Sequence, residues 1–113
     1  MIEKYSFGKI VVNGIPYTHD IKIIQGEVIP NWWRKTGHRV DVNDIMDIVE
    51  AKPDILVIGQ GKPGYMKSSK SLQEFLERNG IDLIEETTSE AVQTTNGLLK
   101  NGKNVAAGFH LTC

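Results

Sequence analysis

The amino-acid sequence predicts an α/β protein of three layers with a mixed central sheet. Three observations lead to this prediction: apolar strand-like runs alternate with helix-like segments, an Asn-Gly pair marks a hairpin near the N-terminus, and turn residues separate the elements. Alternating strands and helices favour a layered sheet with right-handed crossovers, and the hairpin makes the sheet mixed. We expect an N-terminal β-hairpin followed by three helix-strand units.

The hairpin is expected over residues 10–17. Asn13-Gly14 separates two strand-like runs, and this pair tolerates the positive φ angles of a tight turn. Its second arm is expected to continue into residues 21–24. Residues 25–39 lack clear periodicity and are expected to form the longest irregular segment.

The first helix-strand unit is expected after Asp41. Asp41 or Asn43 can cap the helix, whose apolar positions recur with helical spacing at Ile45, Ile48 and Val49. Pro53 marks its end. The wholly apolar run at residues 55–58 then predicts a buried parallel strand.

The second unit begins with Ser71-x-x-Glu74, a capping-box pattern with apolar residues on one face at Leu72, Phe75 and Leu76. Asn79-Gly80 is expected to close this helix in the left-handed conformation. A short strand is expected at residues 81–84.

The third unit begins at Thr87-x-x-Glu90, a second capping-box pattern, and its helix is expected to end at Asn101-Gly102. The final strand is expected at residues 104–111. Its small residues suit a strand inside the sheet, because they allow close packing: Ala106, Ala107 and Gly108.

The composition is that of an ordinary soluble domain. A chain of 113 residues is expected to form one domain, residues 1–113, and to bury about 65% of the surface that its unfolded form exposes. Hydrophobic residues make up 40%, charged residues 24%, and the formal net charge is −1. This charge does not indicate a nucleic-acid partner.

The only cysteine is Cys113, so no internal disulfide can form and a reducing cytoplasm fits best. The N-terminal residues lack a basic segment followed by an apolar one, so no cleaved leader is expected. No apolar run approaches the roughly 20 residues of a membrane span.

A glycine loop follows the buried strand, with Gly59, Gly61 and Gly64 in a Gly-x-Gly-x-x-Gly pattern. One interpretation is a dinucleotide site, with Glu85 or Glu86 near the position of an acidic ribose ligand. The other is a tight strand exit, because the helix signal begins only near residues 68–71. In either case, we expect Gly59 and Gly61 to hold positions that a Cβ would obstruct.

Residues 32–39 form the second unusual segment, with two tryptophans and four potentially cationic side chains. Arginine beside an aromatic ring suits a small anionic or planar ligand. Alternatively, one tryptophan lies in the core and the charges are solvated. If this loop covers the carboxyl edge of the parallel strands, one pocket uses both loops. The candidate ligand-binding residues are Trp33, Arg34, His38, Arg39, Gly59, Gly61, Lys62 and Gly64.

His110 and Cys113 invite a metal or thiol interpretation. Two ligands do not make a tetrahedral zinc site, and nothing near Cys113 in the sequence guarantees a lowered thiol pKa. We expect a docked strand end with His110 held by a hydrogen bond. No catalytic residue and no metal site is expected.

The chain resembles a small family that includes the adipogenesis-associated domain protein, a mitochondrial complex I assembly factor, and bacterial and archaeal hypothetical proteins. The segments that carry the resemblance span most of the chain: Asp20-Ile21, Trp33-x-x-x-Gly37-His38, Leu56–Gly61, Thr87–Ala91, Asn96-x-Leu98 and His110–Cys113. The resemblance implies a three-layer α/β fold and supplies no catalytic residues. The mitochondrial relative has a targeting extension, and none is expected in this chain.

The function expected from these features is a non-enzymatic protein-interaction or small-ligand-binding module. The alternative is an enzyme acting on an anionic, nucleotide-like molecule bound between loops 59–64 and 33–39. Under either function, a binding pocket at these loops should prefer an anion. The amides of loop 59–64 are hydrogen-bond donors, and the nearest cations in the sequence are Arg34, Arg39 and Lys62. We expect a protein or small anionic partner, no cofactor, no nucleic acid, no membrane, and a monomer or small homo-oligomer.

Overall fold

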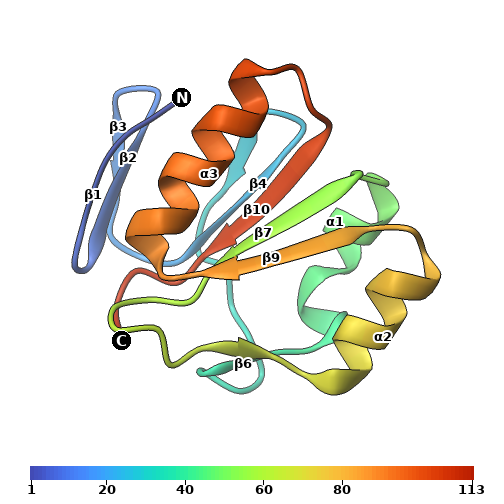
Figure 1. Ribbon diagram of the computed structural model, residues 1–113. Helices are drawn as coiled ribbons and strands as arrows, with labels where there is room; N and C mark the ends of the chain where they lie inside the picture. The colour runs from blue at the N-terminus through green and yellow to red at the C-terminus, as the bar shows by residue number, and fades with distance from the viewer.

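The computed structural model describes residues 1–113 and contains a five-stranded central sheet (Figure 1). The strand order is β5-β4-β10-β7-β9. The strands β10, β7 and β9 are parallel, whereas β4 is antiparallel to β10 and β5 is antiparallel to β4. The mixed sheet is therefore confirmed. The five strands are β4 (Ile21–Ile24), β5 (Glu27–Ile29), β7 (Ile55–Gly59), β9 (Asp82–Glu86) and β10 (Val105–Phe109).

Two further layers cover the faces of this sheet (Figure 1). One face packs against α3 (Thr88–Lys100) and against a three-stranded antiparallel sheet of β1 (Ile2–Ser6), β2 (Lys9–Val12) and β3 (Ile15–Tyr17). The other face packs against the 3-10 helix η1 (Val42–Ile45), α1 (Met46–Glu50) and α2 (Lys70–Arg78). The expected three layers and three helix-strand units are both present.

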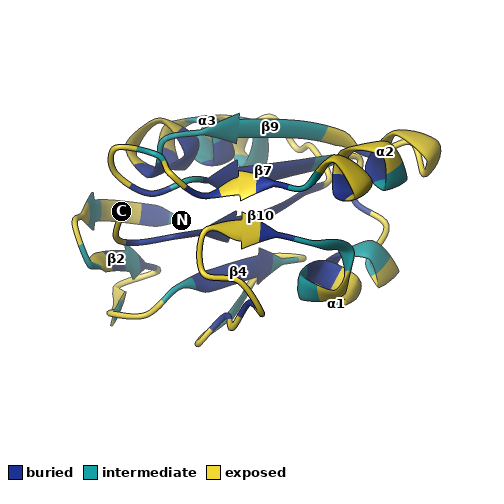
Figure 2. Ribbon diagram, turned by 90° about the horizontal axis from the view of Figure 1, so that it is seen from below, coloured by how far each residue is buried: buried dark blue, intermediate teal, exposed yellow.

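Alternation along the central strands divides the core into two clusters. In β7, Val57 faces the α3 side, while Leu56 and Ile58 face the side of α1 and α2. Figure 2 shows the buried residues concentrated on the central strands. The strand β10 lies between β4 and β7, so its expected interior position is confirmed.

The hairpin at Asn13-Gly14 is confirmed, with φ angles of 50° and 79° at the two turn residues. Its continuation into residues 21–24 is wrong. The strand β3 ends at Tyr17, and the chain turns before β4, which joins the central sheet. The sheet is mixed because of β4 and β5, since the hairpin pairs with β1 in a separate sheet.

The irregular segment at residues 25–39 is partly wrong. It contains β5, and Arg39–Val40 form a short strand, β6, that pairs in parallel with β8 (Lys67–Ser68). Strands of two or three residues are too short to show a recognisable alternation in sequence. This pairing joins the end of the segment at residues 33–39 to residues that follow the glycine loop.

The starts of α2 and α3 each differ in one detail from the expected capping. The N-cap of α2 is Ser69, whose Oγ accepts a hydrogen bond from Leu72 N at 3.1 Å, so Ser71 is not the cap. Thr87 lies at the N-cap of α3 as expected, but its hydroxyl donates to the Glu90 side chain instead of accepting from the backbone. None of the helices is long and apolar enough to cross a membrane.

Candidate functional site

The carboxyl ends of β7, β9 and β10 meet around residues 110–113, which we call the tail segment. The glycine loop, residues 59–64, holds this segment by main-chain hydrogen bonds. His110 N donates to Gly59 O at 2.9 Å, and Lys62 N donates to Thr112 O at 2.9 Å. Gly61 N donates to the Thr88 hydroxyl at 2.8 Å.

Both glycines of the prediction lie where a side chain would be obstructed. At Gly61, φ is 92° and an added Cβ would lie 2.2 Å from Thr112 O. At Gly59, an added Cβ would lie 2.8 Å from the Phe109 ring and 3.0 Å from the Thr88 hydroxyl. The glycines therefore serve the close contact between the loop and the tail segment.

This geometry does not suit a pyrophosphate. The amides of Gly61 and Lys62 donate within the protein, and α2 begins only at Lys70, far along the chain from the glycines. The Glu85 carboxylate accepts hydrogen bonds from Ser68 and from Gln60 Nε2. Glu86, the other acidic residue of that interpretation, accepts from the Thr94 hydroxyl. The amides of Gly61 and Lys62 and both carboxylates are thus already paired within the protein, which argues against the dinucleotide interpretation.

His110, the first residue of the tail segment, forms a buried network with Asp20 and Arg34. Asp20 Oδ2 accepts from Arg34 Nη2 at 2.8 Å and from His110 Nδ1 at 2.7 Å. Asp20 Oδ1 accepts from Leu111 N at 2.8 Å. The side chains of Arg34 and His110 are 5% and 9% exposed, so this network is shielded from solvent.

The Trp32 ring packs against the Arg34 guanidinium of this network. The Arg34 guanidinium lies 4.6 Å from the centroid of the Trp32 ring, and Trp32 Nε1 donates to Asp44 O at 2.9 Å. The ring packs against Gly108, where an added Cβ would lie 2.7 Å from it. Trp32 is thus the core tryptophan, as one of the two interpretations required.

The network changes the pKa values of two groups. Burial opposes ionisation of Asp20, but hydrogen bonds from His110, the Leu111 amide and Arg34 outweigh it and lower the Asp20 pKa. Burial and the nearby Asp20 charge raise the pKa of Tyr5, whose hydroxyl donates to Leu111 O.

Two buried nitrogens of the network have no hydrogen-bond partner, Arg34 Nη1 and His110 Nε2. Because Asp20 Oδ2 is closer to His110 Nδ1 than Arg34 Nη2 is, at 2.7 Å against 3.3 Å, we assign the Nδ1 proton to the Asp20 bond. The expected hydrogen bond of His110 is present.

The loop at residues 33–39 contacts the residues that follow the glycine loop. Lys67 N donates to His38 O at 3.1 Å, and the His38 ring lies edge-on to Tyr65, with 6.4 Å between ring centroids. His38 also lies edge-on to His110, at 5.6 Å. Arg34, His38 and Gly61 therefore converge on the buried His110 imidazole.

They do not line a cavity together. A cavity of about 380 Å³ that His110 does line has these other lining residues: Thr18, His19, Asp20, Asn31, Trp32, Trp33, Leu111 and Thr112. Of the candidate residues, only Trp33 lines it. Arg39 is paired with Asp41, with 3.0 Å between Arg39 Nε and Asp41 Oδ2, while Lys62 is exposed and Gly64 packs against Thr87.

Sequence reasoning did not select Asp20, Trp32 or Tyr65 as site residues. No spacing links Asp20 to His110, because they lie 90 positions apart and meet only through the fold. No group of three or more His, Cys, Asp or Glu side chains is placed to hold a metal ion. Cys113 is a free, exposed cysteine.

The fold and the site define a class of mixed α/β proteins in which a glycine loop fastens the tail segment to the carboxyl edge of the sheet. The chain belongs to the family described as protein of unknown function (DUF498/DUF598), which it matches over residues 2–110.

Solved structures share the fold across nearly the whole chain. A protein named MT938 is 27% identical, with a TM-score of 0.82 over 100% of this chain and 98% of that one. Conserved hypothetical protein PH1505 from Pyrococcus horikoshii OT3 is 24% identical, with a TM-score of 0.85 over 100% and 99% of the two chains. A protein from Bartonella henselae, called an outer membrane protein, is 24% identical, with a TM-score of 0.85 over 99% and 94%.

Proposed function

We propose that this chain is a non-enzymatic binding module that holds an acidic segment of a partner protein on loops 33–39 and 61–67. The observation that carries the proposal is the charge of these two loops. They contain five Lys and Arg residues and no Asp or Glu, in a chain whose net charge is −1. A local excess of one sign favours a partner of the opposite sign.

Three of these cations are free to meet a ligand. Arg34 is paired with Asp20, and Arg39 is paired with Asp41. The remaining cations are exposed, and their ammonium groups have no carboxylate within 4.0 Å: Lys35, Lys62 and Lys67.

Exposed aromatic rings stand among these lysines. Trp33 is 75% exposed and Tyr65 is 61% exposed. Tryptophan and tyrosine are enriched among the residues that dominate binding energy at protein interfaces. The pairing of β6 with β8 and the buried Arg34–Asp20 ion pair fix the main chain near both rings, and a main chain held in place reduces the entropy lost on binding.

A protein partner suits this surface better than the alternative, an enzyme with a small anionic substrate. No cavity lies between the two loops, and a small-molecule site is normally concave. His110 Nε2 is buried, so the Asp20–His110 pair does not present a base to solvent.

The resemblance to a family that includes an assembly factor supports a protein partner in general. We extend the proposal to a role in holding another protein, in the cytoplasm, where a chain with a single cysteine is suited to the reducing conditions.

The test is a fluorescence titration with a short peptide that alternates glutamate and leucine and contains no aromatic residue. Binding should change the emission of the exposed Trp33, and Trp33→Phe should remove this change because Trp32 is buried. Lys62→Glu and Lys67→Glu should each weaken binding about fivefold.

The matched control is Lys103→Glu, an exposed lysine before the amino end of β10, which should bind normally. A peptide with lysine in place of glutamate should not bind at these loops. Equal affinity of the Lys67→Glu and Lys103→Glu proteins would contradict the proposal.

A further inference from the structure

The strand β9 is a free edge of the central sheet. It pairs only with β7, in an unbroken five-residue register from Asp82 to Glu86. It carries no proline and no bulge, the devices that commonly block an edge. The opposite edge, β5, has three residues and is followed by Pro30.

The pairing pattern identifies the main-chain groups at this free edge. Asp82 N donates to Asp54 O, and Glu86 O accepts from Gln60 N, so Asp82 and Glu86 face β7. Residues of a parallel strand point their N–H and C=O alternately to the two sides. Leu83 and Glu85 therefore present their main-chain donors and acceptors outward.

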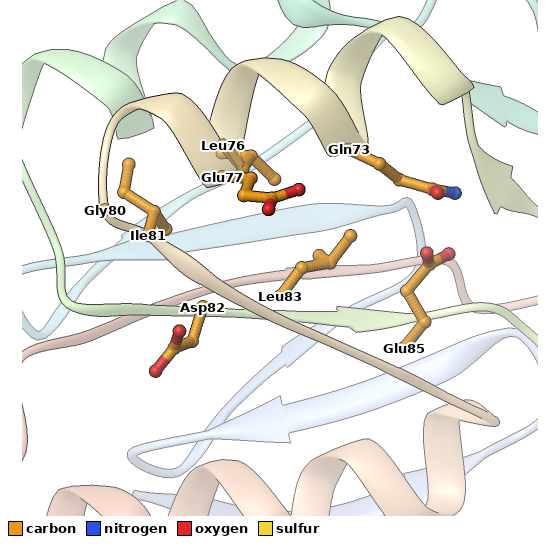
Figure 3. A pocket seen from close by; sticks show the side chains of 8 residues that line it. All are labelled: Gln73, Leu76, Glu77, Gly80, Ile81, Asp82, Leu83 and Glu85. Atoms are coloured by element: carbon orange, nitrogen blue, oxygen red, sulfur yellow. The ribbon is translucent and has the colours of Figure 1, made fainter.

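A groove of about 490 Å³ runs between this edge and α2 (Figure 3). Leu83 and Glu85 point from β9 toward α2, while Leu76 and Glu77 lie on the facing side of the helix (Figure 3). Its lining residues are Gln73, Leu76, Glu77, Gly80, Ile81, Asp82, Leu83 and Glu85. The groove thus combines apolar side chains with unpaired main-chain groups.

The charges of the groove are all negative. Glu77, Asp82 and Glu85 line it, no Lys or Arg does, and none of the three has a cationic side chain within 4.0 Å. Asp82 points to the other side of the strand from Glu85 (Figure 3). Because the Glu85 carboxylate already accepts hydrogen bonds from Ser68 and Gln60, the carboxylates left to meet a cationic chain are Glu77 on the α2 side and Asp82 on the opposite side.

We propose that a basic, extended segment of a partner protein binds here as a sixth strand, by β-augmentation of β9. The main-chain groups of Leu83 and Glu85 provide the hydrogen bonds, the apolar floor accepts alternate side chains, and the carboxylates select lysine or arginine. This site is separate from the basic loops and does not depend on their function.

A second copy of this chain is a poorer occupant. Pairing two β9 edges would set Asp82, Glu85 and Glu86 of one copy against the same residues of the other. Like charges on directly opposite positions destabilise a strand pair. The acidic strand therefore discourages self-association and leaves the edge for a basic chain.

The test uses an acetylated and amidated peptide of about seven residues that alternates lysine and valine, a typical strand length. On binding, amide hydrogen exchange at Leu83 and Glu85 should slow about tenfold or more, because both amides gain acceptors. Exchange at Ile84 should not change, since its amide already faces β7.

Two controls separate main-chain pairing from charge attraction. Methylation of the peptide nitrogens that face β9 should abolish the protection while leaving the charge intact. Glu77→Lys and Asp82→Lys should each weaken binding about fivefold, whereas Glu74→Lys, an exposed position on α2 outside the groove, should bind normally.

Binding of the peptide without protection of Leu83 and Glu85 would overturn the proposal, because attraction by charge alone would then explain it. Protection that appears without peptide as the protein concentration rises would also overturn it, since a second copy would then occupy the edge.

Discussion

Arg34 illustrates how a residue with the right chemistry for a ligand can be used inside the protein. Its guanidinium donates to Asp20 and to Gly37 O, and it stacks on Trp32. The sequence shows an arginine beside aromatic rings, but it does not show which carboxylate the fold brings near. Arg34 therefore belongs to the support of the loop, and the exposed lysines are left for binding.

Because the glycine loop contacts the tail segment closely, one methyl group added at Gly61 should clearly lower the stability of the fold. Gly61→Ala should lower the free energy of unfolding by about 1 kcal/mol or more, because φ is 92° and the Cβ would overlap Thr112 O. Gly97→Ala, in α3 with open space around it, should instead raise stability by about 0.5–1 kcal/mol. Urea denaturation measures both, and an unchanged Gly61→Ala protein would show that the contact is loose.

The lowered pKa of Asp20 predicts that the free energy of unfolding decreases at acidic pH. Because the folded-state pKa lies below the ordinary value of 3.8, ionised Asp20 stabilises the fold above that value. This contribution is lost as the pH falls from about 4 through the folded-state pKa.

Asp20→Asn should therefore cost about 3 kcal/mol at pH 7, where it breaks a buried ion pair, and its difference from the natural protein should shrink below pH 4. Asp54→Asn, at an exposed carboxylate without an ion pair, is the control. Denaturation curves at several pH values test this, and a constant difference down to pH 2 would contradict it.

At the scale of elements, most signals that act within a few residues were reliable, the capping box at Ser71 being an exception, and those that act across the chain were not. The Asn13-Gly14 turn and the apolar run of β7 were predicted because turn preference and burial act locally. The separation of β3 from β4 was missed, since it depends on Asp20 accepting the Leu111 amide from the other end of the chain.

Two serines at the start of α2 should respond differently to replacement by alanine. Ser69→Ala should destabilise the protein by about 1 kcal/mol, because Ser69 Oγ accepts from Leu72 N at the helix terminus. Ser71→Ala, inside the first turn and exposed, should be neutral or slightly stabilising. Thermal unfolding of the two variants decides which serine is the cap. A larger drop in melting temperature for Ser71→Ala than for Ser69→Ala would show that the capping box predicted from sequence is correct.

At the scale of the whole molecule, the central sheet joins the two core clusters. The clusters lie on opposite faces of β7 and β10, and both strands contribute to each. The fold class followed from the alternation of strands and helices. The basic surface did not, because the loops that form it are separated in sequence and meet through β6 and β8, strands of two residues each.

Because both core clusters share the central sheet, we expect one cooperative unfolding transition. We also expect that the stability of the fold depends neither on a bound metal nor on the Cys113 thiol. The melting temperature should not change after chelation or in Cys113→Ser, because the core clusters do not include Cys113. Calorimetry checks this, and two resolved transitions or a large drop after chelation would contradict it.

The most direct test of the central claim is an NMR titration of the labelled protein with the acidic glutamate-leucine peptide. We predict that shifts concentrate on the Trp33 indole N–H and on the amides of loops 33–39 and 61–67, where Lys35, Lys62 and Lys67 are unpaired. Shifts confined to other surfaces, or none at saturating peptide, would contradict the assignment of this surface to an acidic partner.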